Sequence, residues 1–219
     1  MDHVRILLLD DHPALRHGIR QLIDSEPDLQ VCAEATNREE LLEQLNEVTP
    51  DMAIVDITLQ DKNTTGLDLI GDIHAKAGQI PVLVFSMHDE TLYAERAMAA
   101  GARGYLMKQE PVMLLLDAIR AVMRGEIYLS KRMNQALLQA HVKGGAPTHP
   151  DDPVSALSVR EFEILRMLGK GMPPREIAEA MSLSVRTVET HRRNMRNKLG
   201  CGTASELTQF AVDWVHREA

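Results

Sequence analysis

Five polar side chains follow short apolar segments of this chain, each at the point where a segment ends. They are Asp10 and Asp11 after residues 6–9, Asp56 after 53–55, Ser86 after 82–85 and Lys108 after 105–107. If these segments are parallel strands of one sheet, their carboxyl ends meet at a single edge and the five groups converge there. Open α/β sheets bind their ligands at this edge.

The types of these groups indicate a cation site. Three carboxylates that are brought together cannot all stay ionised unless a cation neutralises them. Hard oxygen ligands around an open position suit Mg²⁺. The sequence therefore predicts a magnesium-dependent site for phosphoryl chemistry.

Alternating strand and helix patterns would position these groups. Apolar segments that end near residues 9, 33, 55, 85 and 107 are separated by stretches with helical spacing of apolar residues. The segments 4–9, 53–55 and 82–85 are almost continuously apolar, which is typical of strands buried on both faces. We therefore predict an α/β fold with a five-stranded, doubly wound parallel sheet.

The composition changes after this unit. Residues 143–153 are rich in glycine and proline, which disfavour a packed element and are typical of a linker, and residues 130–142 before them keep helical spacing. The sequence thus predicts a first domain over residues 1–126, a helical and Gly/Pro-rich linker over 127–155, and a second domain over 156–219.

The second domain has a purely helical pattern. Ser158 and Glu161 form a capping box for a first helix, and Pro173-Pro174 can open a second. Ser184 caps a third helix over 185–199, and a fourth runs from about 203 to 216. Four helices are expected, and the tight connection between the second and third predicts a helix-turn-helix unit.

The charge differs between the two halves. Residues 1–125 carry 11 basic and 21 acidic side chains, whereas residues 158–219 carry 10 and 8. Within 185–200 five basic residues face one acid, so we expect different partners for the two halves. The chain has no apolar run near the ~18 residues of a membrane span and no basic, apolar leader, which predicts a cytoplasmic protein without membrane contact.

The predicted third helix of the tail has one polar face. Arg186, Glu189, Thr190, Arg193 and Asn197 share that face, and Val188, Met195 and Leu199 lie opposite. Such a stripe is usually only a solvated surface. The cap, the tight turn and the local basic excess instead favour a helix that lies in the major groove of DNA.

These motifs resemble a known family. The order of acid pair, single acid, hydroxyl and lysine resembles the receiver domain of two-component response regulators over residues 4–124. The segments Ile177-Ala178, Ser184–His191 and Lys198–Gly200 resemble the LuxR-type output domain over 157–214. Together they resemble the NarL/FixJ subfamily. The resemblance implies a flavodoxin-like receiver, a sensor histidine kinase as partner, and a homodimer on double-stranded DNA that regulates transcription and is not an enzyme.

The resemblance also implies roles in the first domain. Asp56 would accept the phosphoryl group, Lys108 would pair with Asp56 and then with a phosphoryl oxygen, and Ser86 would donate to another oxygen. Mg²⁺ would be held by Asp11, Asp56 and the carbonyl of Thr58, with Asp10 acting through a bound water. Tyr105 would be the aromatic switch that moves inward when Ser86 is drawn to the phosphoryl group.

In the second domain the family's base-reading positions correspond to Glu189, Thr190 and Arg193. The other expected DNA contacts are Arg186 and Thr187, with Arg192, Arg196 and Lys198 on phosphates. The fourth helix, through Thr208 and Val212, would be the dimerisation element.

The sequence departs from the family after Asp56. The family usually has Pro four residues after the acceptor and Gly eight residues after it, whereas here Gln60 takes the first place and Gly66 comes two residues late. The longer, more polar loop bears on kinase docking and phosphoryl lifetime rather than on the chemistry itself.

Two other functions stay open at this point. A magnesium phosphatase or transferase also places an Asp after a parallel strand, but such enzymes usually need a substrate cap or insertion, and no Gly-rich phosphate loop is found in this sequence. A constitutively folded DNA-binding protein with a vestigial phosphorylation site is the third possibility. Turnover of an external phosphoester would favour the phosphatase or transferase.

Overall fold

The computed structural model describes residues 3–57, 59, 66–135, 153–181 and 183–218. The chain divides into two compact units, Met1–Thr148 and His149–Ala219, and each is described by itself. Across these described ranges no helix is long and apolar enough to cross a membrane.

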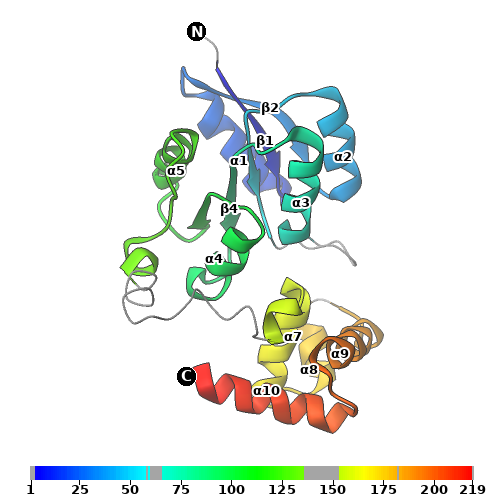
Figure 1. The fold of residues 1–219 in the computed structure, drawn as a ribbon. Helices are drawn as coiled ribbons and strands as arrows, with labels where there is room; N and C mark the ends of the chain where they lie inside the picture. Colours follow the sequence, from blue (N-terminus) through cyan, green and yellow to red (C-terminus); the bar gives the residue numbers. More distant parts are fainter. Residues whose placement is uncertain (1–2, 58, 60–65, 136–152, 182, 219) are drawn as a thin grey trace. The chain divides into compact units, whose positions relative to one another are not determined.

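The first unit is built on a parallel sheet (Figure 1). Its strands lie in the order β2-β1-β3-β4-β5, and every neighbouring pair is parallel. The strands are β1 (Val4–Leu9), β2 (Leu29–Ala35), β3 (Met52–Val55), β4 (Val82–Ser86) and β5 (Gly104–Met107). β3 and β4 are buried along their whole length, as their continuous apolar sequence predicts.

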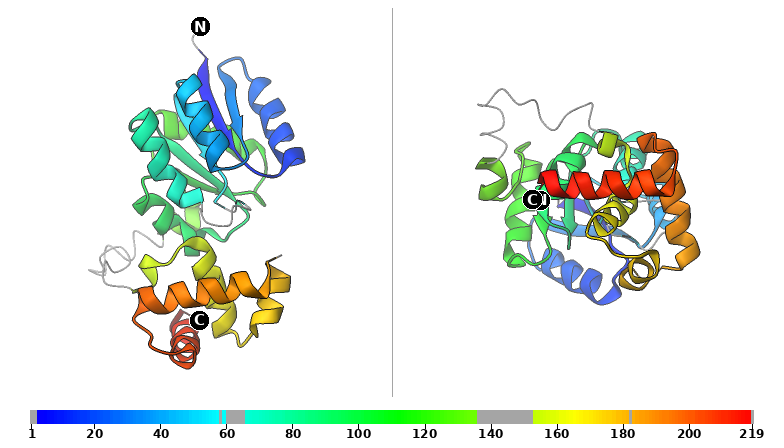
Figure 2. Two further views of the ribbon diagram at one scale, coloured as in Figure 1. Left: turned by 90° about the vertical axis from the view of Figure 1, so that its right-hand side faces the viewer. Right: turned by 90° about the horizontal axis from the view of Figure 1, so that it is seen from below.

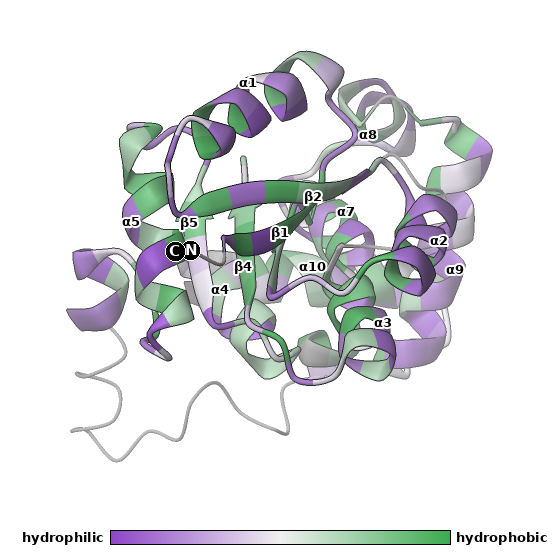
Figure 3. Cartoon of the chain, turned by 90° about the horizontal axis from the view of Figure 1, so that it is seen from above, coloured by the Kyte–Doolittle hydropathy of each residue, from purple (hydrophilic) through white to green (hydrophobic). Residues whose placement is uncertain are grey.

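Helices cover both faces of this sheet (Figure 3). They are α1 (Pro13–Asp24), α2 (Arg38–Glu47), α3 (Gly66–Ala77), α4 (Glu90–Ala99) and α5 (Met113–Met123). Helices α1 and α5 form one hydrophobic core with alternate strand residues such as Ile6, Leu8 and Phe85, because successive side chains of a strand point to opposite faces. Helices α2, α3 and α4 lie over the other face. The predicted five-stranded doubly wound sheet is confirmed.

The segment after α5 covers the free edge of β5. The backbone N–H of Tyr105 donates to the carbonyl of Tyr128 at 2.8 Å, and the N–H of Tyr128 donates to Arg103 at 3.1 Å. The N–H of Ser130 then donates to the buried carboxylate of Glu90 at 2.7 Å. Residues 127–134, which the sequence analysis placed in the linker, therefore pack on the first unit. Residues 136–152 lie outside the described residues.

The second unit is helical (Figure 2). A short 3₁₀ turn (Pro153–Ala156) precedes α7 (Val159–Gly169), α8 (Pro174–Ala180), α9 (Val185–Leu199) and α10 (Ala204–Glu218). Both predicted caps are present: Ser158 and Glu161 form a reciprocal capping box, and Ser184 accepts from the N–H of Thr187. The described part of this unit thus contains the predicted four helices.

Close approach of two helices explains a glycine of the second unit. A Cβ at Gly169 would lie 2.4 Å from the carbonyl oxygen of Ala211, so only glycine lets α7 and α10 come this near. Phe162 of α7 packs edge-to-face on Trp214 of α10, with ring centroids 5.2 Å apart. Val188 and Met195 of α9 complete the buried core.

Gly66 opens α3 against the backbone that carries Asp56. A Cβ at this position would lie 2.2 Å from the carbonyl oxygen of Asp56 and 2.4 Å from the Cα of Ile57. The N–H of Gly66 donates to the carbonyl of Ile57 at 3.3 Å. Although this glycine comes two residues later than in the family pattern, it lies directly on the strand end that presents Asp56.

We expect Gly66→Ala to lower the free energy of unfolding of the first unit by about 1–3 kcal/mol, because the added methyl group overlaps backbone atoms that cannot move independently. Gly71→Ala in the same helix is the matched control: nothing lies within 4 Å of its added Cβ, so it should raise stability by about 0.5–1 kcal/mol. The free energy of unfolding of this unit can be measured by urea unfolding, followed by the near-UV circular dichroism of tyrosine, because all three tyrosines lie in this unit.

The chain's single tryptophan, Trp214, lies in the second unit, so its fluorescence should show the same unfolding midpoint in both variants. A Gly66→Ala protein as stable as the parent would contradict the packing described here.

Candidate functional site

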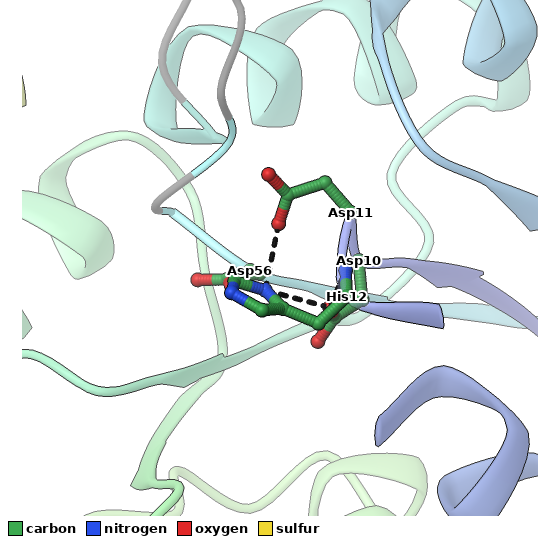
Figure 4. Close-up of side chains that lie close together, drawn as sticks. All are labelled: Asp10, Asp11, His12 and Asp56. Atoms are coloured by element: carbon green, nitrogen blue, oxygen red, sulfur yellow. Dashed lines mark hydrogen bonds and ion pairs between the residues drawn. The ribbon is translucent and has the colours of Figure 1, made fainter. Parts of the chain in front are cut away.

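Three carboxylates gather at the carboxyl edge of the sheet (Figure 4). Asp10 and Asp11 follow β1, and Asp56 follows the neighbouring strand β3, so strand pairing alone brings them together. One ligand atom from each of these residues and from His12 lies within 4.8 Å of the others. Asp10 and Asp56 are buried, and Asp11 is half-buried.

Lys108 completes the cluster from beyond β5. Its Nζ lies 2.7 Å from Oδ2 of Asp10 and 2.5 Å from Oδ2 of Asp56, and its side chain is 3% exposed. The N–H of Lys108 donates to the carbonyl of Ser86 at 2.7 Å, which holds this segment against the end of β4. The buried ammonium is thus shared by two carboxylates, an arrangement that offsets the cost of burying each charge.

His12 is the member of the cluster that sequence reasoning did not include. Its Nδ1 lies 2.8 Å from Oδ1 of Asp11, and its backbone N–H donates to Oδ1 of Asp10 at 2.7 Å (Figure 4). The ring is 55% exposed, so it closes the solvent side of the cluster. His12 follows the acid pair directly and precedes Pro13, the first residue of α1. This position was the signal in the sequence that could have placed it in the cluster.

The donor set fits a divalent cation. Three carboxylates face one ammonium, which leaves an excess of negative charge in a largely buried site. Carboxylate oxygens of Asp11 and Asp56 are hard ligands of the kind Mg²⁺ takes, and a cation there would neutralise this excess. Thr58, whose carbonyl was expected to be a further ligand, lies outside the described residues.

Ser86 and Tyr105 lie beside the cluster. Ser86 is fully buried, and its Oγ accepts from the N–H of His88 at 3.2 Å. Tyr105 is 1% exposed, and its hydroxyl donates to the carbonyl of His88 at 3.1 Å. Burial raises the pKa of Tyr105 well above its usual range, so the phenol stays a hydrogen-bond donor at neutral pH. The ring thus lies inward without a phosphoryl group on Asp56, and the switch role expected of Tyr105 stays a prediction.

Helix α9 of the second unit presents the predicted polar face. Arg186, Glu189, Thr190 and Arg193 are exposed, while Val188 and Met195 are buried on the opposite side. Thr187 is half-buried, and its hydroxyl lies 2.8 Å from the hydroxyl of the cap residue Ser184. The helix therefore has the exposed polar face and the buried apolar face that the sequence predicts.

Two of the basic side chains that were expected to contact DNA phosphates form ion pairs with acidic residues of the same unit. Arg192 is 15% exposed, and its Nη1 lies 2.5 Å from Oε1 of Glu189. Lys198 donates to the buried carboxylate of Glu161 at 2.8 Å. Arg196 is half-buried. Sequence reasoning recognised Glu161 as a cap but missed this ion pair, because the two residues are 37 positions apart.

His191 also lies on the inner side of α9. Burial lowers the pKa of its imidazole, with the positive charges of Arg160 and Lys198 adding to this and Glu161 opposing it. The ring is therefore neutral at physiological pH, which favours a packing role.

In α10, Leu207, Ala211 and Trp214 are buried, whereas Thr208 and Val212 are half-buried. The two positions expected at a dimer contact thus retain accessible surface.

Comparisons with known proteins match both units. The response regulator receiver domain model matches residues 6–120, and the model for bacterial regulatory proteins of the luxR family matches residues 155–211. The oxygen regulatory protein NreC of Staphylococcus aureus (strain MRSA252) is 31% identical over 211 residues, which is 95% of this chain and 97% of that protein.

Solved structures agree. A two-component response regulator of the LuxR family from Aurantimonas sp. SI85-9A1 aligns with a TM-score of 0.59 and 34% identity, over 64% of this chain and 99% of that one. RcsB from Salmonella enterica serovar Typhimurium, bound to promoter rprA with the phosphomimetic BeF3-, aligns over 96% of this chain and 99% of that one, with a TM-score of 0.58 and 21% identity; this likeness shows the fold.

Removal of the Lys108 charge should destabilise the first unit. We expect Lys108→Met to lower its free energy of unfolding by about 3–5 kcal/mol in chelator-containing buffer, because buried carboxylates would lose their counter-charge. The control is Lys76→Met, which removes an exposed ammonium from α3. Urea unfolding with tyrosine detection measures both, and equal stability of the two variants would contradict the described ion pairs.

Proposed function

This chain belongs to the response regulators that join a receiver domain to a LuxR-type DNA-binding domain, and we propose that phosphorylation of Asp56 controls its binding to DNA. The observation that carries the proposal is the contact of the Lys108 ammonium with Asp56, 2.5 Å away, inside a cluster of three carboxylates. A sensor histidine kinase would be the donor.

The reaction is an in-line displacement. A carboxylate oxygen of Asp56 attacks phosphorus, the bond from phosphorus to the donor atom breaks, and the leaving group keeps its electron pair, which yields an acyl phosphate. The Lys108 ammonium, which contacts Oδ2 of Asp56, would be the cation that pairs with a phosphoryl oxygen on this residue. Asp11 and Asp56, with Asp10 through a water, would hold Mg²⁺, which when bound supplies further charge neutralisation.

A path of hydrogen bonds could carry this event to the surface. The phosphoryl group adds about −1.5 to −2 charges and strong acceptors, to which Ser86 would donate. Ser86 is bonded to the N–H of His88, and the carbonyl of His88 accepts from the Tyr105 hydroxyl. The backbone of Tyr105 in turn holds Tyr128, beside Ser130 and Glu90. We infer that the α4–β5–α5 surface is the output.

Helix α9 would bind in the major groove of double-stranded DNA. Arg193, Glu189 and Thr190 lie on its exposed face, and Arg suits guanine while Glu can accept from cytosine. A two-fold homodimer, formed through α10, would match inverted half-sites. Phosphorylation would favour the dimer and so raise affinity for such sites.

Two observations bear on the alternatives. The family of the chain is one of transcription regulators, and the second unit has the exposed polar helix that DNA binding needs, which disfavours a phosphatase or transferase. The retention of Lys108 on Asp56 disfavours a vestigial phosphorylation site, since burying unused charges is costly.

We expect acetyl phosphate with Mg²⁺ to add one phosphoryl group to the full chain, and Asp56→Asn to abolish the addition, because an amide oxygen is a poor nucleophile. Intact-mass measurement follows the product. Asp117→Asn, the same substitution at an exposed position of α5, is the control and should label fully.

Chelation of Mg²⁺ should prevent labelling of both the parent protein and Asp117→Asn. Unchanged labelling of Asp56→Asn would place the acceptor elsewhere, and sustained turnover of an external phosphoester would favour the hydrolase.

Arg193→Ala should relax base preference. We expect it to cost about 1–3 kcal/mol on a duplex selected from a random-sequence library and little on a scrambled duplex, since only a base contact distinguishes the two. Arg196→Ala should weaken binding to both duplexes alike and reduce the salt dependence of the affinity, as loss of a phosphate contact does. Fluorescence anisotropy at several salt concentrations measures both effects, and equal, sequence-independent losses would refute these roles.

A further inference from the structure

Glu161 is a buried carboxylate that is not itself among the expected DNA contacts. It lies in the first turn of α7, and its side chain is 4% exposed. Its Oε2 accepts from the N–H of Ser158 at 2.8 Å and from the ammonium of Lys198 at 2.8 Å. The cap alone would explain the first of these bonds but not the second, which crosses to another helix.

This ion pair joins two helix ends of opposite polarity. Glu161 lies at the N-terminal turn of α7, where the helix dipole favours an anion, and Lys198 lies in the last turn of α9, where it favours a cation. Most surface ion pairs contribute little because water competes for both partners. Here the Glu161 carboxylate is 4% exposed and the Lys198 side chain 40% exposed, so water reaches only one of the two partners, and the ammonium is the charged partner of a buried carboxylate.

The pair holds α9 in a way that its apolar contacts do not. Val188 and Met195 attach the helix to the core, but apolar contact has no preferred direction and tolerates small rotations and shifts. A hydrogen-bonded ion pair has a fixed length and direction. Such a bond at the end of α9 limits where the exposed side chain of Arg193 can lie.

We propose that Glu161 is a positioning residue for DNA recognition, which sets the orientation of α9 through Lys198, and that Lys198 serves this ion pair rather than a DNA phosphate. The inference rests on the proposed binding of DNA through α9. Removing the negative charge of Glu161 should strengthen binding to DNA if only its charge mattered, because DNA is a polyanion. If Glu161 orients α9, the same change should weaken binding.

The test uses the full chain with four single variants and the double variant of Glu161→Gln with Lys198→Met. Glu161→Gln keeps the shape and an acceptor for the cap but removes the charge, and Lys198→Met removes the other partner. Lys198→Arg keeps a cation. Glu163→Gln is the matched control, two residues further along α7, where the carboxylate pairs with Arg160 of the same helix at 3.2 Å. The probes are a duplex selected from a random-sequence library by the parent protein and a scrambled duplex.

Glu161→Gln and Lys198→Met should each weaken binding to the selected duplex by about tenfold, and the double variant should lose no more than either one, because both act through one bond. Lys198→Arg should bind nearly as the parent does, and Glu163→Gln should bind equally or more tightly. The salt dependence of affinity should stay that of the parent in Glu161→Gln and Lys198→Met.

Three results would overturn the inference: unchanged affinity of Glu161→Gln, tighter binding by it, or a salt slope lowered by about one in Lys198→Met, which would make Lys198 a phosphate contact. Trp214 fluorescence reports whether the unit is folded; should Glu161→Gln unfold it, Lys198→Met decides. Failure of the parent to select any duplex would refute the proposed function and this inference together, whereas parent binding with unaffected variants refutes the inference alone.

Discussion

The structure of the receiver domain depends on one buried ammonium group, that of Lys108. Lys108 places its ammonium between Asp10 and Asp56, and these three residues follow β5, β1 and β3 respectively. The ion pairs can form only if the strands are parallel and correctly ordered, because otherwise their carboxyl ends would not meet. The same arrangement that satisfies the charges therefore leaves Asp56 at the sheet edge, next to carboxylate oxygens of the kind that Mg²⁺ takes.

The two units of this response regulator use charge differently. In the receiver, charges are buried together so that a change in one carboxylate alters the balance of the whole cluster. In the DNA-binding unit, the polar face of α9 stays exposed while Arg192 and Lys198 pair with acids of the same unit. Two of the five basic residues of α9 thus have acidic partners within the unit.

Glycine and buried carboxylates connect these sites to their surroundings. Gly66 lets α3 start against the backbone of Asp56, although more residues than usual separate the two in the sequence. The length of that segment therefore does not change how α3 packs on the end of β3. Glu90 accepts from Ser130 and Glu161 accepts from Lys198, each across elements distant in sequence. In both cases a carboxylate in the first turn of a helix organises a neighbouring segment.

The sequence by itself determined the alternation of strands and helices, the helix caps at Ser158 and Ser184, and the convergence of Asp10, Asp11, Asp56 and Lys108, because periodicity and strand ends are local properties. Only the tertiary structure decided what depends on distant partners. It placed His12 on Asp11, bonded the Tyr105 hydroxyl to the His88 carbonyl, attached the segment with Tyr128 and Ser130 to β5 and α4, and joined Lys198 to Glu161. Side-chain pairing between separate elements is set by packing, which no local pattern encodes.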